Sequence, residues 1–218
     1  VKTLLKENGV FVFEDPYLGE IIEKTSFDQI YDEHVYIFSA LSVHNIFAAS
    51  DFELIDVIPQ VTHGGSMRYI LCKKGVRKIS EKVKDTIVNE KKLGLDDSSR
   101  YEIFKTDCEN SKERLINLLS EYSKSGKKVV GYGATSKSTT ILNYCGIKSN
   151  LIEFISDTTP IKQNKFSPGM HIPIKPYEDF LLYNPDIAVL FAWNHRKEIE
   201  LKEKKFIENG GKFISHIS

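Results

Sequence analysis

The sequence has no excess of positive or negative charge, and it has no long apolar run. Its 30 basic and 30 acidic residues cancel, and this balance argues against non-specific binding to nucleic acid or to a membrane surface, which usually leaves a basic excess. No stretch approaches the roughly 20 apolar residues of a membrane-spanning helix, and the chain does not open with the basic and apolar pattern of a secretory signal. We therefore expect a cytoplasmic protein whose partners include neither nucleic acid nor a membrane.

Cysteine is scarce as well. The three cysteines, Cys72, Cys108 and Cys145, are far apart in the sequence. Their spacing matches neither a set of metal ligands nor an even set of disulfide partners, and it suits a reducing compartment. We expect three small buried side chains and no metal site.

The first third of the chain has the pattern of three strands and one helix. Residues 10–16, 52–60 and 66–74 are short apolar runs typical of strands. The last two runs are joined by a short link with two glycines, which favours an antiparallel pair. Apolar residues recur at helical spacing between Val35 and Ala49, so we expect a helix there.

Residues 76–125 are helical in pattern and strongly charged. Gly94 and Gly126 end two amphipathic helices, and Asp96 or Asp97 can cap the start of the second. The pattern indicates solvated helices that bridge two lobes, so we place the domain boundary here.

Strands and helices alternate from Lys127 to the end of the chain. Alternation of this kind predicts a parallel sheet that is covered by helices on both faces. We therefore expect an α/β, Rossmann-like domain in this half. The expected strands are residues 127–133, 151–157, 186–193 and 212–217, and the expected helices are residues 138–146, 177–185 and 195–211.

A glycine loop, "GYGATSKS", follows the first of these strands and can be interpreted in two ways. As a dinucleotide-binding loop it has Gly131 and Gly133, with Ser136 at the third glycine position and Asp157 placed to bind a ribose. As a P-loop it has Gly131 and Lys137 at the right spacing, but Ser136 again replaces a glycine. Neither match is complete.

Both interpretations share the physics of phosphate binding. Glycines let a ligand approach the backbone, and the helix that starts near Thr135 directs its unpaired N–H groups toward the loop. The structural alternative is a tight strand-to-helix turn, capped by Thr135 or Ser136, that binds nothing. We favour a phosphate or nucleotide site.

A second polar group of residues, Tyr31-Asp32-Glu33-His34, comes directly before the expected helix. A phenol, carboxylates and an imidazole together can serve as an acid–base set near neutral pH. The alternative is an acidic helix cap, because Asp32 or Glu33 would be stabilised by the helix dipole.

Polar residues also end other strands. Ligands in open parallel sheets lie beyond the carboxyl ends of the strands. The "GYG" loop, Asp157, and the run Trp193-Asn194-His195 would all lie on that edge. By contrast, His63, Ser66 and Arg68 lie at a strand connection that is more typical of a hairpin than of a site.

The segments 131–147, 155–174 and 192–217 resemble the C-terminal domain of bacterial sugar C-methyltransferases. The first 75 residues are also similar to this family, because "YDEHVYIFS" resembles its active-site segment and "THGGSMRYILCKK" its closing strand pair. These enzymes methylate C-3 of nucleotide-linked 4-keto deoxysugars with S-adenosylmethionine.

The resemblance implies a division of the chain into three parts. Residues 1–75 would hold the fifth to seventh strands of a class I methyltransferase domain, residues 76–126 the linking helices, and residues 127–218 a Rossmann-like C-terminal domain. The family's cysteine-rich zinc region and its S-adenosylmethionine loop have no counterpart here, so we expect the last half of such an enzyme, active only when the donor-binding half is supplied. Three strands without the rest of their sheet would leave an unpaired edge, so we expect association with the donor-binding half or self-association.

The resemblance also implies residue roles. His34 would be the base, Tyr31 would lie near the keto oxygen, and Glu33 would orient the imidazole or the sugar. The C-terminal domain would hold the substrate, a thymidine diphosphate-linked 4-keto deoxysugar. The residues expected to bind it are Gly131, Gly133, Ser136, Lys137, Lys162, Trp193, Asn194 and His195. The alternative is a non-catalytic module that binds a nucleotide or nucleotide sugar, with an NAD-type dehydrogenase less favoured.

Overall fold

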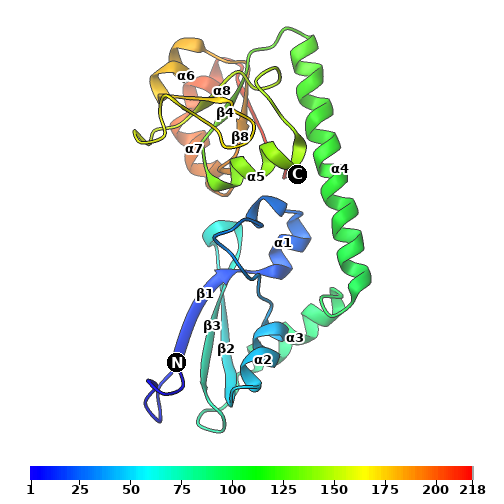
Figure 1. The fold of residues 1–218 in the computed structure, drawn as a ribbon, viewed down its shortest axis with the longest axis vertical. Coiled ribbons are helices and arrows are strands. Elements are labelled where there is room, and N and C mark those ends of the chain that lie inside the picture. The colour runs from blue at the N-terminus through cyan, green and yellow to red at the C-terminus, as the bar shows by residue number, and fades with distance from the viewer. Residues whose placement is uncertain (218) are drawn as a thin grey trace. The chain divides into compact units, whose positions relative to one another are not determined.

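The protein consists of two compact units, seen in a computed structural model that describes residues 1–217 (Figure 1). The first unit contains Val1–Ser26 and His34–Thr106, and the second contains Phe27–Glu33 and Asp107–Ser218. A seven-residue segment from the first third of the chain is thus part of the second unit. Within the described residues, no helix has the length and apolar character needed to cross a membrane.

The first unit contains a three-stranded sheet in the order β1-β3-β2. The strands are β1 (Phe11–Pro16), β2 (Phe52–Gln60) and β3 (Ser66–Lys73), and β3 is antiparallel to both neighbours. The predicted antiparallel pair is therefore confirmed. In β1, Phe11 and Phe13 are partly buried while Val12 and Glu14 are exposed, as the alternation of side chains in a half-buried strand requires.

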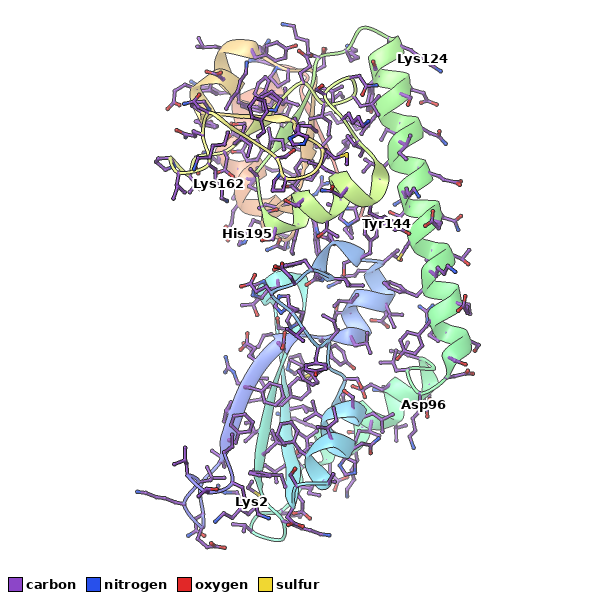
Figure 2. All side chains as sticks on the ribbon, viewed as in Figure 1. Lys2, Asp96, Lys124, Tyr144, Lys162 and His195 are labelled. Carbon is purple, nitrogen blue, oxygen red and sulfur yellow. The ribbon has the colours of Figure 1, made fainter. Side chains whose placement is uncertain are left out.

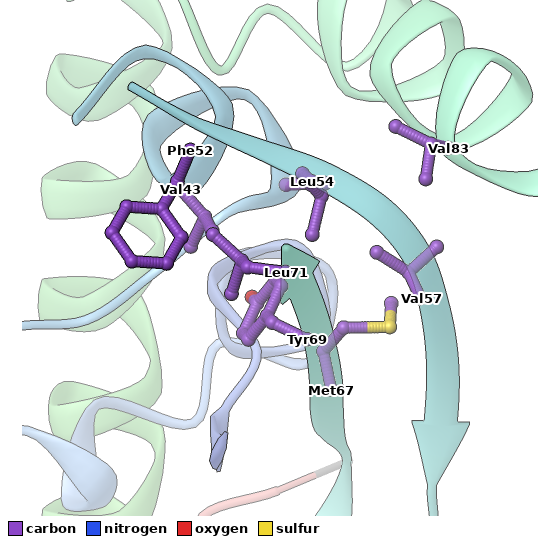
Figure 3. Packing of buried hydrophobic residues seen from close by; sticks show 9 residues of the cluster. Val43, Phe52, Leu54, Val57, Met67, Tyr69, Leu71 and Val83 are labelled. Atoms are coloured by element: carbon purple, nitrogen blue, oxygen red, sulfur yellow. The ribbon is translucent and has the colours of Figure 1, made fainter. Parts of the chain in front are cut away.

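The core of the first unit lies between this sheet and the helices α2 (Ala40–Ala48) and α3 (Glu81–Lys92). Figure 3 shows Val43 from α2 and Val83 from α3 with Leu54, Tyr69 and Leu71 from the strands. These side chains are fully or almost fully buried. A shorter helix, α1 (Leu18–Lys24), follows β1 and buries Ile21 and Ile22.

The expected start of the α2 helix at Val35 is wrong. The helix begins at Ala40, because the Ser39 hydroxyl accepts a hydrogen bond from the Ser42 amide at 3.0 Å and caps the helix there. Val35 and Tyr36 are exposed and lie outside any helix. The segment that carries His34 is therefore irregular, and its conformation depends on tertiary contacts rather than on helical hydrogen bonds.

One charged side chain of the predicted charged helices is not solvated. Glu90 of α3 is completely buried, and its carboxylate accepts hydrogen bonds from the Ala40 and Leu41 amides at 2.7 Å each. The long helix α4 (Ser98–Lys124) follows and ends at Lys124 (Figure 2). The predicted cap at Asp97 is confirmed, since its carboxylate accepts from the Ser99 amide at 2.9 Å.

The second unit is an α/β structure with a six-stranded sheet in the order β6-β7-β5-β4-β8-β9. All neighbouring strands are parallel except β6 and β7, which confirms the predicted Rossmann-like fold class. The strands are β4 (Val129–Tyr132), β5 (Ile155–Ser156), β6 (Lys165–Phe166), β7 (Pro173–Lys175), β8 (Ile187–Leu190) and β9 (Lys212–Ile214). The helices after α4 are α5 (Ser136–Cys145), α6 (Tyr177–Tyr183), α7 (Arg196–Lys202) and α8 (Lys204–Glu208).

The helix expected over residues 195–211 is divided in two at Glu203. The Glu203 side chain is buried, and it accepts hydrogen bonds from the hydroxyls of Tyr132 at 2.6 Å and Tyr177 at 2.8 Å. Burial of this carboxylate against two phenols coincides with the break between α7 and α8. Val130, Phe180 and Phe213 form part of the apolar cluster of this unit.

Candidate active site

His34 lies beside a carboxylate at the end of strand β1. Its Nδ1 atom is 3.0 Å from Oδ1 of Asp15, and the two side chains are mostly buried, with 14% and 23% of their surface exposed. Burial raises the pKa of Asp15, and the nearby imidazoles of His34 and His63 oppose that rise. This carboxylate is therefore within ion-pair distance of the imidazole that the sequence identified as a candidate base.

A second imidazole flanks the pair. The ring of His63 lies edge-on to that of His34, with 6.0 Å between the centroids. His63 has a φ of 56° in the short helix η2 (Thr62–Gly64) between β2 and β3, a left-handed conformation that is uncommon for residues other than glycine. Sequence reasoning assigned His63 to a hairpin and did not single out Asp15.

Tyr31 and Glu33 lie in the segment Phe27–Glu33 of the second unit, while His34, the next residue, belongs to the first. Burial and the neighbouring carboxylate of Glu33, to which the phenol donates a hydrogen bond, raise the pKa of Tyr31 to about 12. The phenol therefore keeps its proton at neutral pH, and in this structure it donates that proton in a hydrogen bond to Glu33. The His34 imidazole thus pairs with Asp15, while the Glu33 carboxylate accepts a hydrogen bond from Tyr31.

Two side chains from later in the second unit form hydrogen bonds to the backbone of the glycine loop. The Ala134 amide donates to Oδ2 of Asp157 at 2.7 Å, and Nζ of Lys162 donates to the Ala134 carbonyl at 2.8 Å. Gly131 lies within β4, where a Cβ atom would come within 2.7 Å of the Phe191 ring. Gly133 has a φ of 88°, so it permits the turn. The carboxylate expected to bind a ribose thus holds a loop amide instead.

Lys137 is buried within the second unit. Its Nζ atom donates to Oδ1 of Asn194 at 3.1 Å and lies 4.5 Å from the centroid of the Trp193 ring. Burial lowers the pKa of the Lys137 ammonium, although the Asp28 carboxylate opposes this effect. Trp193 in turn donates its indole N–H to Asp28 at 2.6 Å. Lys137 therefore contacts both Trp193 and Asn194, and Trp193 contacts the segment Phe27–Glu33.

Two cavities flank the glycine loop, and four of the residues predicted to bind the substrate line one or the other. Ser136 and Lys162 line a cavity of about 370 Å³ that also contains Thr135 and Lys165. Gly133 and His195 line a second cavity of about 350 Å³. Figure 2 marks Lys162 and His195, which both belong to the second unit. Gly131, Lys137, Trp193 and Asn194 line neither cavity.

Residues 1–217 contain no group of three or more histidine, cysteine, aspartate or glutamate side chains that could hold a metal ion. The three cysteines are buried and free, as expected.

Two comparisons with known proteins show the family of the chain. Residues 61–218 match the family model described as the C-methyltransferase C-terminal domain. The chain is 35% identical over 215 residues to the C-methyltransferase NovU of Streptomyces niveus. That alignment covers 98% of this chain and 51% of NovU, so the chain spans about half the length of this curated relative.

Proposed function

Since this chain belongs to the C-methyltransferase family, we propose that it supplies the acid–base residues for methylating C-3 of a nucleotide-linked 4-keto deoxysugar. Methyl transfer to carbon requires a carbanion equivalent, which forms when a base removes a proton from the carbon next to a ketone. The observation that carries the proposal is the proximity of His34 to Asp15, an imidazole 3.0 Å from a partly buried carboxylate.

His34 is the base in this proposal. When Asp15 holds the Nδ1–H tautomer, the basic lone pair of the imidazole is on Nε2. Nε2 takes the proton from C-3, the C–H electron pair forms the C-3–C-4 double bond, and the carbonyl electron pair moves onto the C-4 oxygen. Asp15 then lies 3.0 Å from the imidazolium that has formed, where its negative charge stabilises the positive one.

Tyr31 is the donor to the enolate oxygen. Its raised pKa, about 12, keeps the hydroxyl protonated, so the phenol can donate a hydrogen bond as negative charge develops on the C-4 oxygen. Glu33 accepts from the same hydroxyl, and it would hold the phenol in position before the substrate binds.

The family implies S-adenosylmethionine, whose sulfonium supplies an electrophilic methyl group. The described residues do not fit this cofactor. The glycine-rich loop that follows a parallel strand among these residues is that of Gly131 and Gly133. Its Ala134 backbone is already hydrogen-bonded to Asp157 and Lys162. We therefore assign to these residues the activation of the acceptor carbon and assign the methyl donor to no residue among them.

The substrate's diphosphate is proposed to bind at the second unit. Ser136 and Lys162 line the cavity of about 370 Å³, where the start of α5 and two lysines provide amide N–H groups and positive charge. Gly133 and His195 line the cavity of about 350 Å³ and are assigned to the remainder of the nucleotide.

Hydrogen exchange at C-3 tests the base without a methyl donor. The chain is incubated in D₂O with a thymidine diphosphate-linked 4-keto deoxysugar, and deuterium at C-3 is followed by NMR or mass spectrometry. We expect His34→Ala to slow exchange by about 10²- to 10⁴-fold while nucleotide-sugar affinity by calorimetry stays the same. His44→Ala, which removes an exposed histidine of α2, is the control and should exchange normally.

Equal exchange rates in the wild type and His34→Ala would remove His34 from the role of base. If the wild type neither exchanges nor binds the nucleotide sugar but releases heat with NADH, the dehydrogenase alternative would replace the proposal.

A further inference from the structure

Asp28 is a fully buried carboxylate three residues before Tyr31, and its two oxygens have different partners in the second unit. Trp193 donates its indole N–H to Oδ2 at 2.6 Å, and Nε2 of His216 lies 3.0 Å from Oδ1. A buried carboxylate is costly unless its oxygens are paired. Both partners come from the C-terminal third of the chain, so Asp28 ties an early segment to residues more than 160 positions away.

The partners of Asp28 are themselves fixed. The His216 carbonyl accepts hydrogen bonds from Ser111 at 2.9 Å and Arg114 at 2.6 Å, both on α4. The Trp193 ring lies 4.5 Å from Nζ of Lys137, a cation–π distance. The contacts from α4 fix the backbone at His216, and the Lys137 ammonium packs on the Trp193 ring, so both partners of Asp28 are held within the second unit.

The same segment is packed as well as hydrogen-bonded. Phe27 is buried between the rings of Tyr144 and His216, with 4.9 Å between centroids in each case. The short helix η1 (Phe27–Gln29) packs against α5. Together these contacts explain why Phe27–Glu33 is part of the second unit although the chain on either side of it is part of the first.

We propose that Asp28, with Trp193 and His216, forms an anchor through which the C-terminal domain positions Tyr31 for catalysis. The inference rests on the proposed function, since it gives the C-terminal domain a second task besides holding the nucleotide. The polar groups of Trp193 and Lys137, expected from sequence to contact the substrate, are directed at this anchor. Asp28, Trp193 and His216 are positioning residues, because they act through Tyr31.

Amide hydrogen exchange measured by mass spectrometry tests the anchor without any turnover. Trp193→Phe keeps an aromatic ring near Lys137 but removes the donor to Asp28. We expect it to speed amide exchange of peptides covering residues 27–33 by about 10-fold, as the loss of a hydrogen bond to a charged group would predict. Tyr177→Phe is the matched control, because it removes a phenol donor to another buried carboxylate, Glu203, in the same unit. Tyr177→Phe should leave the amide exchange of residues 27–33 unchanged.

A double-mutant cycle connects the anchor to Tyr31. Trp193→Phe and Tyr31→Phe are each expected to slow C-3 deuterium exchange about 10-fold, and the double variant should be no slower than Tyr31→Phe alone. Asp28→Asn retains one acceptor for the Trp193 indole. It should therefore partly preserve both the rate of C-3 deuterium exchange and the fluorescence of the single tryptophan. Far-UV circular dichroism verifies that each variant is folded.

Unchanged amide exchange of residues 27–33 in Trp193→Phe would overturn the anchor. Additive losses in the cycle would overturn its link to Tyr31. Absence of C-3 exchange in the wild type would instead count against the proposed function, and the amide-exchange result would still decide whether the anchor exists.

Discussion

Asp15 illustrates a conflict between stability and function at the level of one residue. Burial raises its pKa in the folded protein above the ordinary value. A carboxyl group whose pKa is raised on folding stabilises the fold fully below its unfolded pKa, and this contribution is lost as the pH rises through the folded pKa. The ionised form that His34 needs at neutral pH is therefore the less stable form of the protein.

Asp15→Asn should separate the two effects. An amide carries no charge to desolvate, so we expect Tm at pH 7 to rise by about 2 °C and to depend less on pH between 4 and 7. The amide cannot balance an imidazolium, so C-3 deuterium exchange should slow by about 10²- to 10⁴-fold. Thermal melts at both pH values and the NMR assay measure these outcomes.

Asp32→Asn, at an exposed position, is the control for Asp15→Asn. It should change neither Tm nor the rate of C-3 deuterium exchange. A drop in Tm at pH 7 for Asp15→Asn would show that the charge of Asp15 stabilises the fold and would contradict this account of its pKa.

The candidate site could be predicted only in part from the sequence. Tyr31, Glu33 and His34 are consecutive or nearly so, and a run of titratable groups is visible in one line of sequence. Asp15 and His63 come near His34 through the pairing of β1 with β3 and through a left-handed turn. Neither leaves a local pattern, because a strand-end carboxylate and a hairpin histidine are common.

At the level of elements, α3 stabilises α2 through a buried side chain. The Glu90 carboxylate accepts from the first two amides of α2 and from the Tyr17 hydroxyl at 2.9 Å. Negative charge at a helix N-terminus is favourable, and charged hydrogen bonds are among the stronger ones. A side chain from another helix thus satisfies amides that the Ser39 cap leaves without an intrahelical partner.

Glu90→Gln should therefore destabilise the first unit. We expect the free energy of unfolding to fall by about 2 kcal/mol, because the neutral amide offers a single acceptor where two amides and a phenol donate. The urea midpoint measured by circular dichroism should fall. The midpoint measured by Trp193 fluorescence, which reports the second unit, should fall less. Glu81→Gln, whose surface pair with Lys84 is exposed, serves as the control. Equal midpoints for Glu90→Gln and the wild type would contradict this role.

The elements themselves were predicted well where the pattern is local. The strands 52–60 and 66–74 and the alternation after Lys127 appear in the structure because hydrophobic periodicity reflects burial of one or both faces. The helix start at Ala40 and the break at Glu203 were missed. In both cases a polar side chain, Ser39 or Glu203, overrides an apolar pattern that continues past it.

At the level of the whole molecule, the division into units was the feature least accessible from the sequence. Segment Phe27–Glu33 joins the second unit through single residues that contact groups far along the chain, chiefly Asp28 and Phe27. Sequence periodicity reports which face of an element is buried, but it does not report which unit buries it. An isolated Asp or Phe in a loop therefore gives no indication of its partner.

Strand β1 leads to a prediction for the whole molecule. Within residues 1–217, β1 pairs with β3 on one side alone, and the exposed side chains of Val10 and Val12 add apolar surface to it. The opposite edge strand, β2, contains Pro59, which discourages strand addition. An unpaired edge with apolar neighbours favours pairing with a second copy of the chain.

We expect the isolated chain to self-associate as its concentration rises, and Val12→Lys to reduce that association because a lysine on an edge strand opposes pairing. Light scattering after size-exclusion chromatography, over a concentration series, measures the mass. Val88→Lys is the matched control, since Val88 is an exposed valine of α3 in the same unit, and it should associate like the wild type. A wild type that stays monomeric at every concentration, or an equal effect of both lysines, would show that β1 is not the site of association.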